Sequence, residues 1–270
     1  MNCTDKLEYL RKRIKEKESL LVAFSGGVDS SLLAKVAKDV LGEKALSIIL
    51  DSETMPRSEL KLAEEIADSL GLNHRVAKFS ILTDEKFIEN TSTRCYICKK
   101  RSAGVLSKIA DQQGINCIAD GVNLSDYEDF RPGIKACNEE GIWHPFVDAE
   151  MTKEDIRTMA LSQGLANWDK PSSACLSSRI PYGEKITDEN LGMVEEAEDY
   201  LKSLGFIQLR VRAHGQMARI ELQKPDMQLA LNCGDEIAKT LKDIGFKYVT
   251  LDLVGFRSGS MNEILWTSRE

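Results

Sequence analysis

Leu20-Leu21-Val22-Ala23-Phe24-Ser25-Gly26-Gly27-Val28-Asp29-Ser30-Ser31-Leu32-Leu33-Ala34, residues 20–34, contains the clearest structural pattern of the chain. Residues 20–24 form a short apolar run, which is typical of a strand buried on both faces. Gly26 and Gly27 break that run, and apolar residues from Leu32 onward recur at helical spacing. The stretch therefore predicts a buried strand, a tight glycine turn and a helix.

The turn has the composition of a phosphate site. A strand–turn–helix junction directs backbone N–H groups and a helix N-terminus towards one point, which suits a phosphate. The hydroxyls of Ser25, Ser30 and Ser31 add donors, and Asp29 is a suitable ligand for a magnesium ion on those phosphates. The alternative is an ordinary turn capped by serines. Two glycines, three serines and an aspartate within seven residues favour the phosphate site.

Neither the Gly-x-x-x-x-Gly-Lys-Ser/Thr motif nor the Gly-x-Gly-x-x-Gly motif occurs in the turn. Ser-Gly-Gly-Val-Asp-Ser-Ser instead resembles the pyrophosphatase loop of the N-type ATP pyrophosphatases. In that superfamily the loop holds the pyrophosphate that leaves when ATP adenylates a substrate. The resemblance implies that this chain uses ATP.

Further strands and helices alternate along the first part of the chain. Apolar runs predict strands at 45–50, 75–79, 116–119 and 143–146, and helical periodicity predicts helices at 56–70, 96–113 and 152–163. This alternation predicts an α/β fold with a doubly wound parallel sheet. Ligands of such sheets bind at the carboxyl ends of the strands, which here carry Ser25 to Ser31, Asp51-Ser52 and Asp120-Gly121.

The pattern changes after residue 169. Residues 170–185 contain two prolines and four serines without helical periodicity, so we expect an ordered linker loop that lines the site. Residues 186–270 predict a smaller α+β domain. Its expected elements are helices at 187–204, 226–231 and 235–244, an antiparallel strand pair at 207–213 and 217–222, and a last strand at 248–254.

Composition excludes several classes of protein. The chain has 270 residues and a net charge of −7, which argues against a nucleic-acid partner. No apolar run is long enough to span a membrane, and residues 1–18 predict a charged amphipathic helix rather than a signal peptide. We therefore expect a cytoplasmic protein without membrane association. In that compartment the seven cysteines are not expected to form structural disulfides.

Three cysteines are candidate ligands or reactive thiols. Cys95 and Cys98 form a Cys-x-x-Cys pair at the start of a predicted helix, and Cys175 stands alone in the linker loop. A redox pair, half of a zinc site and half of an iron–sulfur site all fit the pair. Three thiolates can hold a [4Fe–4S] cluster and leave one iron open, but spacing alone does not separate these interpretations.

The predicted C-terminal domain carries a second set of anion-binding candidates. Arg210 and Arg212 share one face of a strand, and Glu221 and Arg257 lie further along the chain. Paired arginines suit a phosphate or a carboxylate. A solvated strand face with ion pairs to Glu221 explains the same pattern about equally well.

Together these stretches resemble the LarE family, the ATP-dependent sulfur transferases of nickel-pincer nucleotide cofactor biosynthesis. The resemblance runs through residues 25–31, 94–101, 120–133 (DGVNLSDYEDFRPG), 170–187 (KPSSACLSSRIPYGEKIT) and 248–262 (YVTLDLVGFRSGSMN). It implies an adenine nucleotide alpha-hydrolase-like fold and adenylation of the carboxylates of pyridinium-3,5-biscarboxylic acid mononucleotide. Sulfur then replaces each adenylate.

The resemblance also implies roles for single residues. Ser25, Gly26, Gly27, Asp29, Ser30 and Ser31 would bind the phosphates and magnesium, and Ser52, Met55 and Gly121 would contact adenine and ribose. Arg210, Arg212, Glu221 and Arg257 would form an anion-binding patch for the substrate's phosphate or for pyrophosphate. Cys95, Cys98 and Cys175 match the family type whose [4Fe–4S] cluster carries the sulfide to be delivered. Asp29 and Cys175 are then the catalytic candidates, a sulfide donor is required, and a trimer or hexamer is expected.

Three rival functions remain open on the sequence. In the first, Cys175 gives up its own sulfur in the same pathway. In the second, the protein thiolates tRNA, although the net charge of −7 and the absence of further cysteine pairs oppose this. In the third, it is a non-catalytic nucleotide-binding sensor with an iron–sulfur or zinc site.

Overall fold

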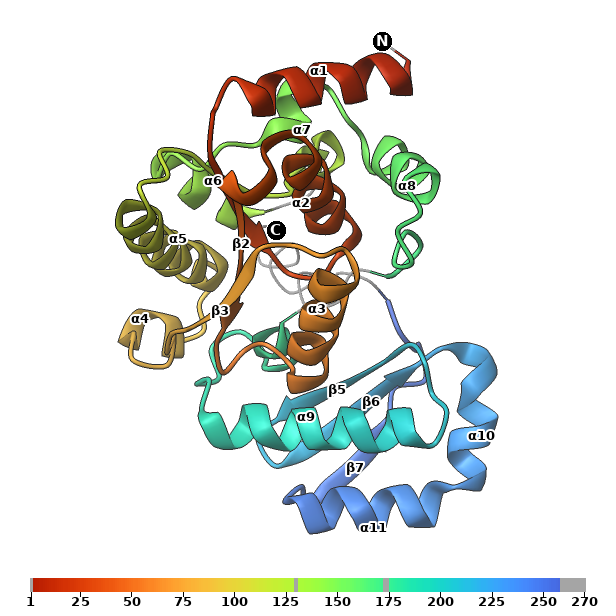
Figure 1. The fold of residues 1–270 in the computed structure, drawn as a ribbon. Coiled ribbons are helices and arrows are strands. Elements are labelled where there is room, and N and C mark those ends of the chain that lie inside the picture. Colours follow the sequence, from red (N-terminus) through yellow and green to blue (C-terminus); the bar gives the residue numbers. More distant parts are fainter. Residues whose placement is uncertain (1, 129–130, 172–174, 258–270) are drawn as a thin grey trace. The chain divides into compact units, whose positions relative to one another are not determined.

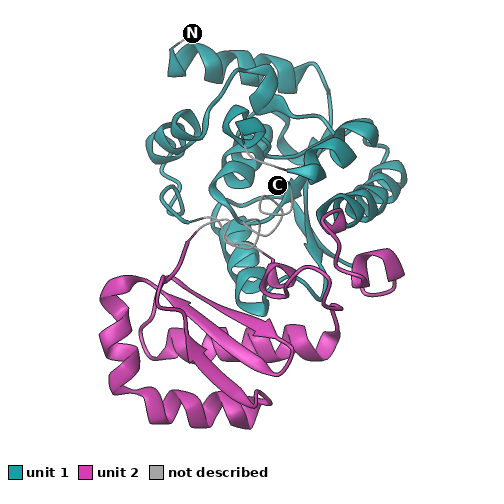
Figure 2. Cartoon of the chain, turned by 180° about the vertical axis from the view of Figure 1, so that it is seen from behind, with its two compact units in different colours: residues 1–81, 95–173 teal, residues 82–94, 174–270 magenta. Residues whose placement is uncertain are grey.

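The computed structural model of the chain describes residues 2–128, 131–171 and 175–257 (Figure 1). It consists of two compact units, which are coloured separately in Figure 2. Unit 1 comprises residues 1–81 and 95–173, and unit 2 comprises residues 82–94 and 174–270. Unit 2 thus takes in residues 82–94, which the sequence pattern assigns to the first domain. Among the described helices, none has the length and apolar character needed to cross a membrane.

Unit 1 is built on a four-stranded parallel sheet with the strand order β3-β2-β1-β4. Its strands are β1 (Leu20–Phe24), β2 (Ala45–Asp51), β3 (His74–Lys78) and β4 (Ile118–Ala119). The chain leaves β1 in the centre, goes to β2 and β3 on one side, and returns to β4 on the other. The order therefore reverses next to β1, and ligands of doubly wound sheets bind at such a point.

Helices cover both faces of this sheet (Figure 1). They are α1 (Cys3–Lys15), α2 (Val28–Leu41), α3 (Arg57–Ser69), α5 (Arg94–Gln113), α6 (Pro132–Glu139), α7 (Pro145–Asp148) and α8 (Lys153–Ser162), with short 3-10 turns at Gly42–Lys44 and Leu124–Glu128. Leu20, Val22 and Phe24 pack on the side of α1, α2, α3 and α8, whereas Leu21 packs against α5. This alternation explains why β1 is apolar at every position.

The predicted parallel α/β sheet is confirmed, with one exception among its strands. The run at 143–146 is not a strand, because only Trp143 makes a single bridge to Ala119. Pro145 instead starts the helical turn α7. A proline fixes φ and has no N–H to give to a sheet ladder, so it favours the first turn of a helix.

Unit 2 contains a three-stranded sheet with the order β5-β6-β7. Strands β5 (Leu209–His214) and β6 (Met217–Leu222) are antiparallel, as predicted, and β7 (Tyr248–Leu251) runs parallel to β6. Its helices are α4 (Glu85–Ile88), α9 (Asp188–Ser203), α10 (Met227–Asn232) and α11 (Gly234–Ile244), with 3-10 turns at Leu176–Arg179 and Lys224–Asp226. Helix α9 packs on β5, and α11 packs on β7 and α9. The smaller α+β region predicted from the sequence is therefore present.

Candidate active site

The loop between β1 and α2 forms the centre of the candidate site in unit 1. Gly26 has a φ of +70°, and a Cβ atom on it would lie 2.8 Å from the Cα of Ala63 in α3. Both the backbone conformation and the close approach of α3 therefore require glycine. Gly27 caps α2 without a side-chain hydrogen bond, so the first N–H groups of the helix are not taken up by a capping side chain. This is the arrangement that binds phosphate at a helix N-terminus.

The three serines of the loop differ in exposure. Ser25 is exposed, and its Oγ lies 3.2 Å from the Oγ of the buried Ser30. Ser30 Oγ also donates to the Gly27 carbonyl oxygen at 3.1 Å. Ser31 is fully buried, and its Oγ accepts a hydrogen bond of 3.0 Å from Asn167 Nδ2. Ser25 is thus the loop serine most accessible to a ligand, while Ser30 and Ser31 shape the loop.

Asp29 is held by two side chains that the sequence pattern does not reveal. Its carboxylate forms an ion pair with Lys153 at the start of α8 and accepts a hydrogen bond of 3.3 Å from Asn123 Nδ2. The Asp29 side chain is only 24% exposed. Lys153 and Asn123 lie far from the loop in sequence, and no local pattern connects them to it. Only the packing of α8 against α2 reveals the contact.

The segment that follows β4 lies against the loop. A Cβ atom on Gly121 would lie 2.9 Å from the Cβ of Asp29, so this position also requires glycine. Next to it, the buried Asp120 accepts a hydrogen bond of 2.6 Å from Nδ1 of His144. Burial opposes the charged form of Asp120, but the hydrogen bond from His144, the positive charge of Lys99 and the Val122 N–H together outweigh it, so the pKa of Asp120 is lowered. A charged Asp120 thus fixes the segment that brings Gly121 against Asp29.

The carboxyl end of β2 supplies the other residues expected at this site. Ser52 is buried, and its Oγ lies 3.1 Å from the Thr54 Oγ1. Met55 is half-buried and packs against the main core of unit 1. Because β1, β2 and β4 are neighbouring parallel strands, the structure brings their carboxyl ends to one edge of the sheet. The contacts of Ser52, Met55 and Gly121 with adenine and ribose stay predictions.

The three candidate ligand cysteines divide between the units. Cys95 is exposed and Cys98 is half-buried, and they lie one turn apart at the start of α5. Cys175 is exposed in unit 2, where it precedes the 3-10 turn at Leu176–Arg179 with its Sγ 2.9 Å from Ser177 Oγ. No disulfide joins the seven cysteines, all of which lie in the described residues. In that part of the chain, no group of three His, Cys, Asp or Glu side chains is arranged to hold a metal ion.

A buried clamp in unit 2 joins the segment before Cys95 to the segment after Cys175. Asn90 adopts a φ of +54°, is fully buried, and donates from Nδ2 to the carbonyl oxygens of Ile180, Pro181 and Glu184. Arg94 donates to Asn90 Oδ1 and to the Ile180 carbonyl oxygen. Asn90 belongs to no motif, and Arg94 begins the stretch at 94–101 without an expected role there, so the sequence does not reveal the contact between them.

The arginines of the β5–β6 hairpin, residues 209–222, are largely paired within unit 2. Arg212 is buried and donates to both carboxylate oxygens of the buried Glu221, at 3.0 and 2.9 Å. Arg219 donates to the same carboxylate at 2.9 Å. Burial, followed by the positive charge of Arg179, lowers the pKa of Arg210 to about 10, and its guanidinium lies over the ring of Phe256. The alternative expectation was a solvated strand face with ion pairs to Glu221. The structure shows these pairs, but Arg212 and Glu221 are buried rather than solvated.

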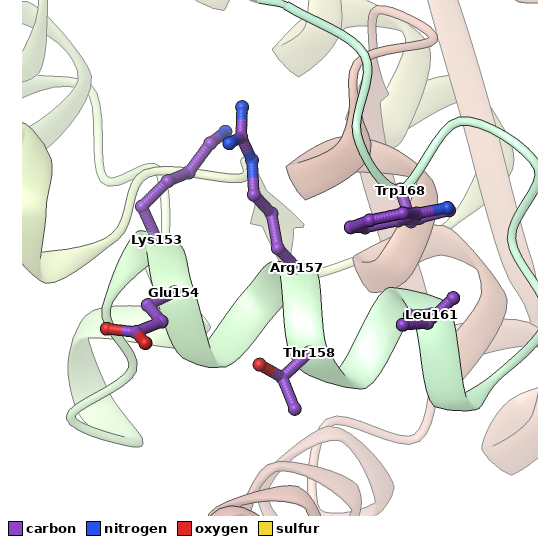
Figure 3. Close-up of a pocket in the computed structure, with 6 residues that line it drawn as sticks. All are labelled: Lys153, Glu154, Arg157, Thr158, Leu161 and Trp168. Atoms are coloured by element: carbon purple, nitrogen blue, oxygen red, sulfur yellow. The ribbon is translucent and has the colours of Figure 1, made fainter.

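A pocket of about 410 Å³ lies beside α8 in unit 1 (Figure 3). Its lining residues are Lys153, Glu154, Arg157, Thr158, Leu161 and Trp168. Lys153 connects the pocket to the loop, because its ammonium group pairs with Asp29. The sequence predicts only a helix for this segment, since one lysine and one arginine at helical spacing do not distinguish a site from a solvated face.

Comparisons with known proteins agree with this architecture. The profile of the NAD synthase family matches residues 3–94. The chain is 40% identical to the pyridinium-3,5-bisthiocarboxylic acid mononucleotide synthase of Lactiplantibacillus plantarum, over 93% of this chain and 92% of that protein. It is 42% identical to an uncharacterized protein of Synechocystis, over 96% and 98% of the two chains. A glutamine-hydrolyzing GMP synthase subunit of Methanococcus maripaludis (strain C7) is 29% identical over 72% of this chain and 66% of its own length.

Proposed function

Since the chain belongs to the LarE family of ATP-dependent sulfur transferases, we propose that it converts the carboxylates of pyridinium-3,5-biscarboxylic acid mononucleotide into thiocarboxylates. A substrate carboxylate oxygen attacks the α-phosphorus of ATP, the bond to the β-phosphate breaks, and pyrophosphate leaves. Sulfide then attacks the acyl carbon of the adenylate, and AMP leaves with the former carboxylate oxygen. The second carboxylate undergoes the same two steps.

The observation that carries the proposal is the loop at residues 25–31. Gly26 allows α3 to approach the loop closely, Gly121 does the same for the segment after β4, and the uncapped N-terminus of α2 suits the phosphates of ATP. Asp29 offers hard carboxylate oxygens, which fit magnesium. A magnesium ion there would share Asp29 with Lys153, whose ammonium group can then turn towards an anionic ligand.

For the sulfur source, we propose that Cys95, Cys98 and Cys175 hold a [4Fe–4S] cluster. Thiolates are the ligands that such clusters take, and two of the three side chains are exposed. The cluster would present a sulfide on the iron that has no protein ligand. The chain's own contribution is to place the thiols, and the Asn90–Arg94 clamp supports this by fixing the segments next to Cys95 and Cys175 within unit 2.

The direct test incubates the protein with ATP, Mg²⁺, sulfide and the bis-acid mononucleotide, and measures pyrophosphate, AMP and the mass of the product. We expect two pyrophosphates per bisthiocarboxylate formed, and loss of pyrophosphate release in Asp29→Asn. Nucleotide binding without pyrophosphate release would instead support a sensor. Release stimulated by tRNA and not by the mononucleotide would support tRNA thiolation.

The sulfur source has a separate test on anaerobically prepared protein. We expect iron and acid-labile sulfide in the wild type and their loss in Cys95→Ser and Cys175→Ser. Cys233→Ser is the matched control, because Cys233 is half-buried between α10 and α11 and has no role in the proposal. Protein without iron whose Cys175 peptide loses hydrogen sulfide during the reaction would establish the sacrificial mechanism, which the exposure of Cys175 also permits.

A further inference from the structure

The pocket beside α8 has an apolar interior and two cationic side chains. Trp168, Leu161, Lys153 and Arg157 are among the residues that line it. Trp168 is half-buried and packs against the main core of unit 1, which fixes the orientation of its ring. A volume of about 410 Å³ lies in the range of pockets for small molecules. A flat aromatic wall suits a planar ring.

Arg157 has an unused hydrogen-bond donor in this pocket. Its Nε is buried and has no hydrogen-bond partner among the described residues. Several buried side-chain atoms of the described residues share this feature, and Arg157 Nε is the one that belongs to a residue of this pocket. Because buried donors are usually paired, a ligand acceptor at this position would be favourable. Lys153 lies four residues before Arg157 on α8, and its ammonium group pairs with Asp29 on the loop side. An oxyanion in the pocket would give the Arg157 Nε–H an acceptor and would be a second anionic partner for Lys153.

The cationic and acidic side chains of the pocket also point in different directions. Figure 3 shows Lys153 and Arg157 projecting to the same side of α8, towards the side on which Trp168 lies. Glu154, the acidic residue of the lining, projects away from them. The carboxylate of Glu154 therefore leaves the cationic side of the pocket open to an anion.

We propose that this pocket binds the aromatic ring of the pyridinium substrate, with Arg157 and Lys153 on its carboxylates and Trp168 on its ring face. The inference rests on the proposed function and names the part of unit 1 that receives the reacting end of the substrate. The substrate is complementary in two respects. Its anionic carboxylates suit the two cations, and its cationic ring suits the electron-rich face of an indole.

The position of Lys153 supplies a reason for placing the substrate there. Its ammonium group contacts Asp29 in the phosphate loop, so the Lys153 end of the pocket lies next to the ATP loop. A carboxylate bound at that end is held next to the loop that would hold the pyrophosphate part of ATP, and so on the side from which the adjoining α-phosphate can be attacked. Holding two reactants together in this way is a large part of catalysis by proximity.

The test uses N-methylpyridinium-3,5-dicarboxylate, which has the ring and both acids but no ribose or phosphate, and measures its binding to the full chain by calorimetry without ATP. We expect Arg157→Gln to weaken binding roughly tenfold, as for the loss of one charged hydrogen bond. Arg157→Lys should recover part of the loss. Arg75→Gln is the matched control, because Arg75 is an exposed arginine on β3, and it should bind like the wild type.

The role of Trp168 is tested with isophthalate, which has the same two carboxylates on an uncharged ring. The wild type should prefer the pyridinium probe, and Trp168→Leu should abolish that preference. No binding of the probe to the wild type, or equal binding to wild type and Arg157→Gln, overturns the inference. Normal turnover with an unchanged KM in Arg157→Gln also overturns it while leaving the proposed function intact. Probe binding without pyrophosphate release on the full substrate overturns the proposed function instead.

Discussion

The sequence predicts an anion site both in the loop at residues 25–31 and in the β5–β6 hairpin. In the structure, the two regions differ in whether their hydrogen-bond donors already have a partner. In the loop, the N-terminus of α2 has no capping side chain. In the hairpin, the charge of Arg212 is already matched by the buried Glu221, which Arg219 shares. An anion site therefore differs from an internal ion pair in whether its donors are available to a ligand, and not in its residue types. A buried guanidinium bound to a carboxylate has few donors left for a ligand.

The largest expected effect comes from removing the carboxylate of the hairpin. Glu221→Gln leaves Arg212 buried without its counter-charge, and the loss of one partner of a buried ion pair typically costs about 3–5 kcal/mol of folding free energy. Urea unfolding of the full chain measures this loss. Glu196→Gln, an exposed glutamate on α9, is the control and should stay within about 0.5 kcal/mol of the wild type. Unchanged stability with lost substrate affinity would instead make Glu221 a ligand of the substrate.

The next largest effect is expected in the loop. Gly26→Ala places a Cβ atom 2.8 Å from Ala63 Cα at a φ of +70°, and backbone strain of this kind costs on the order of 1–3 kcal/mol. The loop has to shift, so ATP binding should weaken along with stability, as calorimetry and urea unfolding can measure. Gly104→Ala in α5 is the control, because its Cβ would meet no atom within 4 Å. ATP affinity equal to wild type in Gly26→Ala would contradict the importance of this geometry.

A smaller effect on stability is expected from Lys153→Gln. The ion pair with Asp29 is partly exposed, so its loss should change the free energy of unfolding by less than about 1 kcal/mol. The dependence of ATP binding on magnesium should change more, because Lys153 no longer competes with the metal for Asp29. A magnesium titration of nucleotide binding in the wild type and in Lys61→Gln, whose side chain is 80% exposed, provides the comparison. An unchanged magnesium dependence would argue against Asp29 as the metal ligand.

The smallest perturbation is chemical labelling of the cysteines, which compares exposed thiols with a buried one. Burial raises the pKa of Cys137 to about 11, whereas Cys95 and Cys175 are exposed. A thiol with a raised pKa has less thiolate at neutral pH and reacts more slowly. Alkylation of apo protein at pH 7.5, followed by peptide mass spectrometry, should label Cys95 and Cys175 well before Cys137. Rapid labelling of Cys137 in folded protein would show that its surroundings open.

Much of the fold was predictable because its strands and helices depend on local sequence patterns. The apolar run at 20–24, the glycine turn and the helical periodicity that follows predicted β1, the loop and α2, and the parallel sheet is confirmed. The failure at 143–146 has a local cause, since an apolar run containing Pro145 was interpreted as a strand. The antiparallel pairing of β5 and β6 was also correctly predicted, and the structure places the turn between them at Gly215-Gln216.

The strand–loop–helix unit, the family and the candidate site residues could be inferred from the amino-acid sequence, because these depend on residue type and on short spacing. The packing of the folded chain, by contrast, selects which of those residues remain available to a ligand. It paired Asp29 with Lys153 and Asn123, buried Ser31 against Asn167, and neutralised Arg212 with Glu221. The reason is physical: an ion pair or hydrogen bond depends on distance in space, and these contacts join residues between 9 and 136 positions apart in the chain.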